Sequence, residues 1–189
     1  KAIEEARVIS GDDDRLEYFQ VNNPQLQKLS ESTSVLIDAK NLIETESGQY
    51  RINASTLKEE FNLCPSESFA EQDSGGICSA FLVKPNVMVT AGHCVIGQTD
   101  CQKTKFVFDY AIKNQGDSSP KVVSKDFVYS CKNVIKSVFE YSGADFAVIE
   151  LDREVVNSTP LTFRTEGKAN VGDKITVMGH PSGLPMKVA

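Results

Sequence analysis

Histidine is scarce in this 189-residue chain: only His93 and His180 are present, and no two of the five cysteines form a Cys-x-x-Cys pair. The ligand spacing typical of zinc sites is therefore missing, and no cofactor or metal is predicted. No apolar run approaches the roughly 18 residues that a membrane-spanning helix needs, which predicts a soluble protein without a membrane partner. Residues 1–7 also lack the apolar core of a signal peptide, so we expect any export signal to have been removed already.

Positive charge is also in the minority. Lysine and arginine total 20 against 26 aspartates and glutamates, which gives a formal net charge of −6. Nucleic-acid binding needs clustered cations, so the acidic balance argues against a nucleic-acid partner. Hydrophobic residues make up 40% of the chain, with 12 glycines and 7 prolines, and this composition indicates a folded globular protein.

Short apolar segments rich in Val, Ile, Phe and Tyr follow one another from Cys78 onward. They cover residues 78–83, 87–91, 106–112, 121–124, 127–129, 134–139, 146–151 and 175–179. Turn sequences such as Pro85-Asn86 and Ser142-Gly143 separate them. Upstream, we expect an extended arm with one turn over 1–29, a short strand over 34–39 and a short helix over 56–61. The pattern predicts an all-β chain folded as an antiparallel barrel or sandwich.

Five cysteines in a β-type sequence favour disulfides, so the chain is predicted to be secreted or periplasmic. Cys101 and Cys131 lie on opposite sides of two predicted strands and are expected to pair. The odd count leaves Cys64, which we expect to bond to a cysteine outside this chain.

The most informative segment is Val89-Thr-Ala-Gly-His-Cys94, in which a predicted strand ends and a histidine follows. The small residues Ala91 and Gly92 allow the backbone to pack closely around His93. Cys78 lies 16 residues before Cys94, and a disulfide between them would fix the histidine loop and stabilise the fold by roughly 3 kcal/mol. The alternative is a histidine that serves only the packing of the core.

Asp145 stands at the start of a second informative segment, Asp145-Phe-Ala-Val-Ile-Glu-Leu151. The strand is apolar on both faces, so we expect a buried carboxylate, which needs a hydrogen-bonding partner to stay ionised. An imidazole is the partner that makes chemical use of it, because the carboxylate holds the ring tautomer. The alternatives are that Asp145 only caps a turn, or that Asp109 or Asp126 partners the histidine.

Together these segments resemble the trypsin-like serine proteases of the two-barrel fold. Thr90-Ala-Gly-His-Cys94 is similar to the catalytic-histidine motif of that family, and the strand from Asp145 is similar to its catalytic-aspartate strand. The resemblance implies that His93 is the general base and acid and that Asp145 orients it. It also implies that Cys78 and Cys94 form the disulfide that flanks the histidine, and that the substrate is a protein or peptide.

The same resemblance extends toward both ends of the chain. Residues 171–183 resemble the opening strand of the second barrel in the bacterial glutamyl-endopeptidase (V8-like) branch, and residues 8–15 resemble the start of its mature enzymes. The implied fold is all-β, with two six-stranded antiparallel barrels. Residues 8–158 would form an arm and the first barrel, and 159–189 only the start of the second.

The family's serine nucleophile is missing from this pattern. It stands in a Gly-Asp-Ser-Gly or Gly-Asn-Ser-Gly segment downstream of the aspartate, and no such segment follows Asp145. Asp73-Ser-Gly-Gly76 looks similar but precedes His93, so we interpret it as a short flexible loop. In Gly179-His-Pro-Ser-Gly183 a proline precedes Ser182, so we expect a turn there, with His180 in the turn or on the surface. The chain alone is therefore predicted to be inactive, with the serine and the C-terminal remainder of the second barrel beyond residue 189.

Two further hypotheses concern regulation and a rival function. Arg7-Val8 resembles an activation junction, in which case residues 1–7 would be a propeptide remnant and the chain an inactive proenzyme; a chance dipeptide is the alternative. The rival function is a protease-like protein that binds without catalysis because its serine is replaced.

Overall fold

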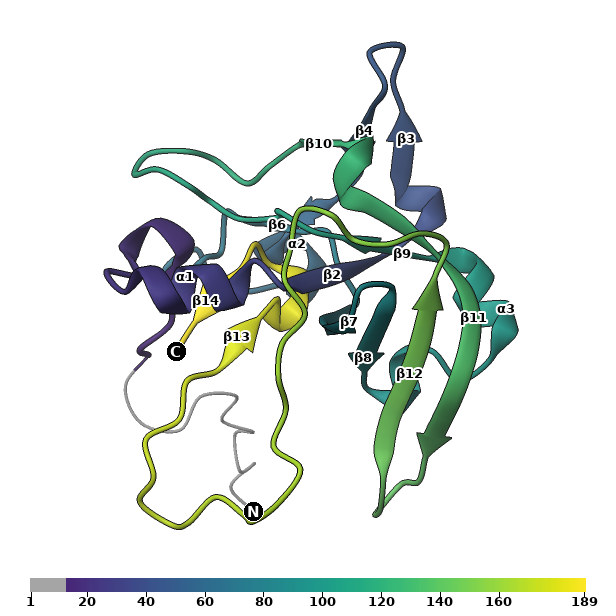
Figure 1. The fold of residues 1–189 in the computed structure, drawn as a ribbon. Coiled ribbons are helices and arrows are strands. Elements are labelled where there is room, and N and C mark those ends of the chain that lie inside the picture. The colour runs from purple at the N-terminus through teal and green to yellow at the C-terminus, as the bar shows by residue number, and fades with distance from the viewer. Residues whose placement is uncertain (1–12) are drawn as a thin grey trace, which may run out of the picture.

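The computed structural model describes residues 13–189, and its centre is a closed antiparallel barrel of six strands (Figure 1). Around the barrel the strand order is β11-β12-β8-β7-β2-β9. The bounds of these strands are Thr33–Asp38 for β2, Cys78–Lys84 for β7, Val87–Thr90 for β8, Thr104–Val107 for β9, Val128–Phe139 for β11 and Asp145–Leu151 for β12. The expectation of a mainly β chain with an antiparallel barrel is confirmed.

The barrel closes around a core to which all six strands contribute. Its fully buried side chains include Leu36 from β2, Leu82 from β7 and Phe106 from β9. In β12 every second residue faces this core, since Ala147, Ile149 and Leu151 are all buried. Asp145 continues the same alternation, which places its side chain at the mouth of the barrel, where the core ends.

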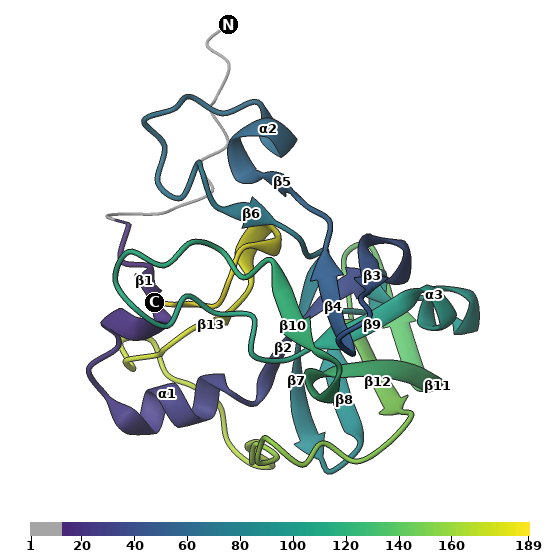
Figure 2. The ribbon, with the colours of Figure 1, turned by 90° about the horizontal axis from the view of Figure 1, so that it is seen from above.

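A small sheet covers the outside of the barrel. It consists of β3 (Leu42–Glu44), β4 (Gln49–Ile52) and β10 (Val122–Ser124), and it encloses a second apolar cluster against the outer face of β2 and β9. Beyond it, β5 (Ser55–Thr56), α2 (Leu57–Phe61) and β6 (Asp73–Ser74) lie at one end of the molecule (Figure 2).

Two helices form where the sequence patterns did not indicate them. In the expected extended arm, α1 runs over Pro24–Ser30 because the Asn23 side chain accepts hydrogen bonds from the amides of Gln25 and Leu26. Pro24 occupies the first helical position, where its missing N–H costs nothing. The other is α3 (Gln98–Lys103), which follows the histidine loop. Short 3₁₀ turns occupy Tyr18–Gln20, Ala39–Asn41, Gly92–Cys94 (η3), Lys125–Phe127 and Pro181–Gly183 (η5).

The two ends of the described chain meet in a three-stranded sheet, in which β14 (Lys187–Val188) lies between β1 (Leu16–Glu17) and β13 (Met178–Gly179). Within the described residues no strand forms between 152 and 177. The first part of this loop still lies on the barrel, since Val155 packs in its core and the Leu161 amide donates to the Leu82 carbonyl. Residues 162–177 then extend away from it (Figure 1). A second barrel is thus not shown in this chain. The Arg7-Val8 junction and the segment 1–7 lie outside the described residues.

The Asp73-Ser-Gly-Gly76 segment, expected to be a short flexible loop, begins with strand β6 and continues in a loop whose amides are hydrogen-bonded. Asp73 is buried in β6, and the amides of Gly75 and Gly76 both donate to the carbonyl of Gly183. A Cβ on Gly76 would lie 2.1 Å from Cγ2 of Val35, so only glycine fits this contact. The segment therefore docks η5 onto the barrel.

His180 begins a turn as expected, since it caps η5 and its carbonyl accepts from the Gly183 amide, but the side chain is buried rather than on the surface. Its side chain is 3% exposed, its Nδ1 lies 3.0 Å from the Leu184 carbonyl and its backbone amide donates to Ser79 Oγ. Its Nε2 is buried without a hydrogen-bond partner among residues 13–189. Because burial penalises the charged imidazolium, the pKa of His180 falls from the usual 6.5 to about 4.

We therefore expect stability to fall as the pH drops from about 6.5 to about 4. In this range the unfolded chain binds a proton at His180 that the folded protein refuses, at a cost of about 3 kcal/mol by pH 4. Above pH 6.5 the imidazole is neutral in both the folded and the unfolded chain, so this cost is absent and the full stability is retained. Urea unfolding of wild type and His180→Gln at several pH values measures it, because the difference between the two proteins removes the effect of other groups. A difference that does not change with pH would contradict the prediction.

Candidate active site

His93 lies in η3, immediately after strand β8. Gly92 makes this position possible, since a Cβ there would lie 2.0 Å from the carbonyl oxygen of Val138 in the neighbouring strand β11. It would also lie 3.1 Å from Oδ1 of Asp145. Because Gly92 has no side chain, the loop can pack against β11 and β12. This close packing brings the side chains of His93 and Asp145 together.

Asp145 begins β12 and binds His93 at two points. Its Oδ2 lies 2.7 Å from His93 Nδ1, and its Oδ1 accepts a 2.9 Å hydrogen bond from the backbone amide of His93. These hydrogen bonds, the backbone one first, hold the pKa of Asp145 below its usual value. An ionised carboxylate can only accept, so the proton of the neutral ring stands on Nδ1 and Nε2 keeps its lone pair.

The environment of the pair is more open than the sequence suggested. The His93 side chain is 53% exposed and that of Asp145 is 33% exposed, so the expectation of a buried carboxylate was wrong. The reason is that Asp145 is the first residue of β12 and so lies at the rim of the barrel. Of the alternative partners, Asp109 forms an ion pair with Lys113 instead.

Phe139 is a neighbour of His93 that the sequence did not reveal. It ends β11, opposite Asp145 in the strand register, and its ring meets the imidazole edge to face at 5.9 Å between centroids. Such a contact limits the rotation of the imidazole. The pattern contained no signal for it, because pairing across the hairpin depends on the length of the turn between the strands.

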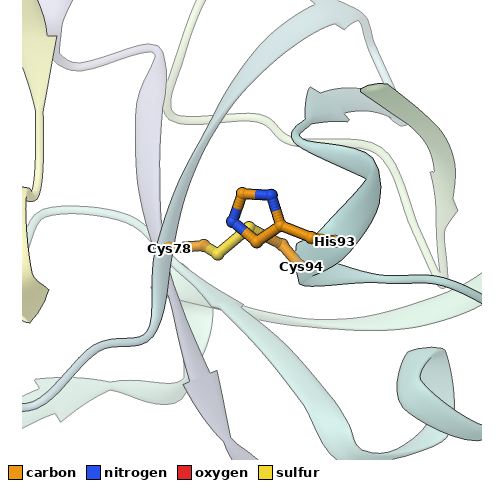
Figure 3. A group of neighbouring side chains, drawn as sticks. All are labelled: Cys78, His93 and Cys94. Atoms are coloured by element: carbon orange, nitrogen blue, oxygen red, sulfur yellow. A yellow bond between two sulfur atoms is a disulfide. The ribbon is translucent and has the colours of Figure 1, made fainter. Parts of the chain in front are cut away.

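A disulfide joins Cys78 at the start of β7 to Cys94 at the end of η3, with 6.3 Å between the Cα atoms. Figure 3 shows the His93 ring lying beside this bridge. A second disulfide, Cys101–Cys131, attaches α3 to β11. Among the described residues Cys64 is the free cysteine, and it is exposed. Ligand atoms of Cys78, His93 and Cys94 lie within 4.8 Å of one another, which makes these the residues that could hold a metal if the sulfurs were not bonded.

The serines singled out in the sequence lie elsewhere. Ser74 donates its hydroxyl to the carbonyl of Ser182, and Ser182 itself lies in η5 with a left-handed backbone (φ 50°). Neither hydroxyl forms a hydrogen bond with His93, whose Nδ1 contacts Asp145 instead. What the site offers chemically is therefore a positioned base whose Nε2 is free, next to a carboxylate that supports it.

Within residues 13–189, no helix is both long and apolar enough to cross a membrane.

Comparison with known proteins gives one family match. The family model described as "Trypsin-like peptidase domain" matches residues 78–189, which include η3, β12 and the final strands. Among solved structures, the crystal structure of the scabies mite inactivated protease paralogue S-I1 is 18% identical, with a TM-score of 0.49. The match covers 86% of this chain and 60% of the length of that one. No curated protein matches the chain.

Proposed function

The chain belongs to the trypsin-like peptidase domain family, and from this we propose that it is part of a serine endopeptidase in which His93 is the general base and acid and Asp145 orients it. The observation that carries the proposal is the pair of hydrogen bonds that the Asp145 carboxylate accepts from the ring Nδ1 and the backbone amide of His93. A carboxylate that merely capped a turn would not need the imidazole as a partner.

In the proposed mechanism, the geometry assigns one task to each side of the ring. Asp145 holds the proton on Nδ1, so Nε2 presents a lone pair to the proton of an attacking hydroxyl. When the ring takes that proton, the adjacent carboxylate stabilises the imidazolium. His93 then returns the proton to the leaving amine. The Cys78–Cys94 disulfide and the close packing at Gly92 support the position of the histidine through these steps.

The serine nucleophile, in this proposal, lies in sequence that follows residue 189. The support is that no Gly-Asp-Ser-Gly or Gly-Asn-Ser-Gly segment follows Asp145 in the 189 residues. The same segment would supply the oxyanion hole and the pocket for the side chain before the cut. Residues 8–158 would then form the arm and the first barrel, and 159–189 the part of the second barrel that the C-terminal remainder completes.

Three finer proposals concern localisation, the branch of the family and activation. The disulfides support a secreted or periplasmic peptidase. The resemblance of residues 171–183 to the V8-like branch supports a place for the protein in that branch of the family. Cleavage between Arg7 and Val8 would convert a zymogen into the mature form, and comparing hydrolysis before and after that cleavage tests it.

The decisive experiment uses the full-length protein and a fluorophosphonate probe, which labels an activated serine. We expect the wild type to be labelled and His93→Ala to lose both labelling and peptide hydrolysis, because no base remains to activate the hydroxyl.

Lys40→Ala is a suitable control for this substitution, because Lys40 pairs with Asp38 on the surface. It should be labelled like the wild type. Labelling that survives in His93→Ala would show that His93 is not the base. A folded wild-type protein that is never labelled would favour the rival function of a non-catalytic binding protein.

A further inference from the structure

The disulfide beside His93 brings together a set of metal-ligating atoms that the sequence spacing did not predict. Cys78 comes from β7, whereas His93 and Cys94 come from η3, so the chain brings them together only through the barrel. Their ligand atoms lie within 4.8 Å of one another (Figure 3). Two cysteines and one histidine form a well-known ligand set for Zn²⁺ that leaves a fourth position open.

The distances are near those that zinc requires. Zinc–sulfur bonds of about 2.3 Å and zinc–nitrogen bonds of about 2.1 Å place tetrahedral ligand atoms about 3.6–3.8 Å apart. The imidazole nitrogen, within 4.8 Å of the sulfurs, thus needs to approach them by at most about 1.2 Å. Once the S–S bond is broken, the sulfurs can separate by side-chain rotation, because the Cα atoms of Cys78 and Cys94 are already 6.3 Å apart.

Asp145 adds the feature that makes the cluster resemble a metal site. A histidine that ligates zinc usually donates its other ring N–H to a carboxylate, which fixes the ring and makes the ligating nitrogen more basic. Asp145 Oδ2 stands 2.7 Å from Nδ1 of His93 and so already plays that part. The nitrogen left free is Nε2, and in Figure 3 the imidazole lies beside the sulfurs of the bridge.

The two disulfides differ in how exposed their cysteines are to solvent. Cys78 and Cys94 are both partly exposed, whereas Cys101 is fully buried and Cys131 is 9% exposed. Thiol–disulfide exchange needs access of the attacking thiolate to a sulfur, so a dithiol reductant reaches the bridge beside His93 first. The core around Cys101–Cys131 is then still in place to hold the barrel.

We propose that reduction of the Cys78–Cys94 disulfide by a dithiol creates a Zn²⁺ site formed by the two cysteine sulfurs and Nε2 of His93, with water at the fourth position. The dithiol gives two electrons and two protons to the bridge and becomes a cyclic disulfide, leaving two thiols. Zinc then displaces one proton from each thiol and binds both thiolates and the neutral imidazole. Since Nε2 is the base in the proposed function, the bound metal would block hydrolysis; this last step alone rests on that function.

The test measures metal binding directly and needs no nucleophile. A Cys64→Ser protein removes the exposed free thiol, which could bind metal by itself. The protein is treated with dithiothreitol, desalted without oxygen and titrated with Co²⁺ and with Zn²⁺. Mass spectrometry after alkylation should find two new thiols, at Cys78 and Cys94. We expect one metal ion per reduced chain, with a thiolate-to-cobalt charge-transfer band, and none bound to the oxidised chain.

Comparing the Zn²⁺ affinities of two variants, each lacking one of two similarly exposed carboxylates, distinguishes a specific zinc site from nonspecific binding. Asp145→Asn should weaken Zn²⁺ binding about 10- to 100-fold, because the carboxylate behind the ligating histidine is lost. Asp109→Asn should leave it unchanged, since Asp109, 35% exposed against 33% for Asp145, pairs with Lys113. His93→Ala should remove the one-to-one binding.

The remaining outcomes of these titrations either support the zinc site or overturn it. Equal affinity in His93→Ala and wild type, or in Asp145→Asn and Asp109→Asn, would overturn it. Circular dichroism shows whether the reduced chain is folded at the start of the titration. Zinc binding by a reduced chain that is already folded, or that folds when zinc is added, supports the site. One that binds zinc and stays unfolded overturns it. If the full-length wild type is not labelled by the fluorophosphonate probe but its reduced form still binds zinc, the proposed peptidase function is wrong and the zinc site stands.

Discussion

Asp145→Asn is expected to lower kcat of the complete peptidase by about 10⁴-fold, which is the scale of this change in a serine protease triad. The asparagine amide can still contact the ring, but it carries no charge and can donate to Nδ1. The ring would then bear its proton on Nε2, where the lone pair is needed. The measurement is the kinetics of peptide hydrolysis by the full-length protein across a pH series.

Asp109→Asn is the matched control for this substitution, because its carboxylate is similarly exposed but pairs with Lys113 rather than with His93. We expect its kinetics to equal those of the wild type. A loss of the same size in both variants would point to a general electrostatic effect, and a normal rate in Asp145→Asn would exclude the proposed role of this aspartate.

Lys187→Ala is expected to lower the free energy of unfolding by about 3–5 kcal/mol, as is usual when one partner of a buried ion pair is removed. The Lys187 side chain is 2% exposed, and its ammonium donates to Oε2 of Glu17, to Oε1 of Gln72 and to the Pro185 carbonyl, all within 3.0 Å. Burial lowers the pKa of Lys187, an effect that Glu17 opposes. Without the ammonium, the buried Glu17 carboxylate keeps the hydrogen bond from Gln72 Nε2 but loses the positive charge that pairs with it. Urea unfolding measures the loss.

A double variant distinguishes an unpaired charge from lost packing. In Lys187→Met with Glu17→Gln, neither charge remains and the volume is nearly kept, so we expect most of the lost stability to return. A double variant as unstable as Lys187→Ala would mean that the lost lysine contacts, and not the stranded carboxylate, cause the effect.

The barrel and the pairing of His93 with Asp145 were accessible from the sequence because both depend on short-range patterns. Short apolar segments separated by turn sequences predicted most barrel strands, and Gly92 beside His93 indicated a close backbone approach. Asp145 was singled out because it begins an apolar strand. Its contact with His93 required only that β12 pair with β8, which neighbouring apolar strands favour.

Other features depend on partners distant in the sequence, and no local pattern contained them. His180 is in the core because η5 docks on Gly75 and Gly76, about a hundred positions earlier. Lys187 is buried only because Glu17 and Gln72 meet it there. The exposure of Asp145 follows from the position of β12 at the rim, which residue types do not reveal.

The pairing of β1 with β14 has a consequence for how the chain folds. Glu17 and Lys187 stand 170 residues apart in sequence, whereas the β7–β8 hairpin of the barrel closes over a few residues. Closing a loop of that length costs more chain entropy than closing a hairpin, and the cost is recovered only when both partners are in place. The barrel can therefore assemble from its hairpins first, and the sheet of β1, β14 and β13 joins last, sealing Glu17 and Lys187 beneath it.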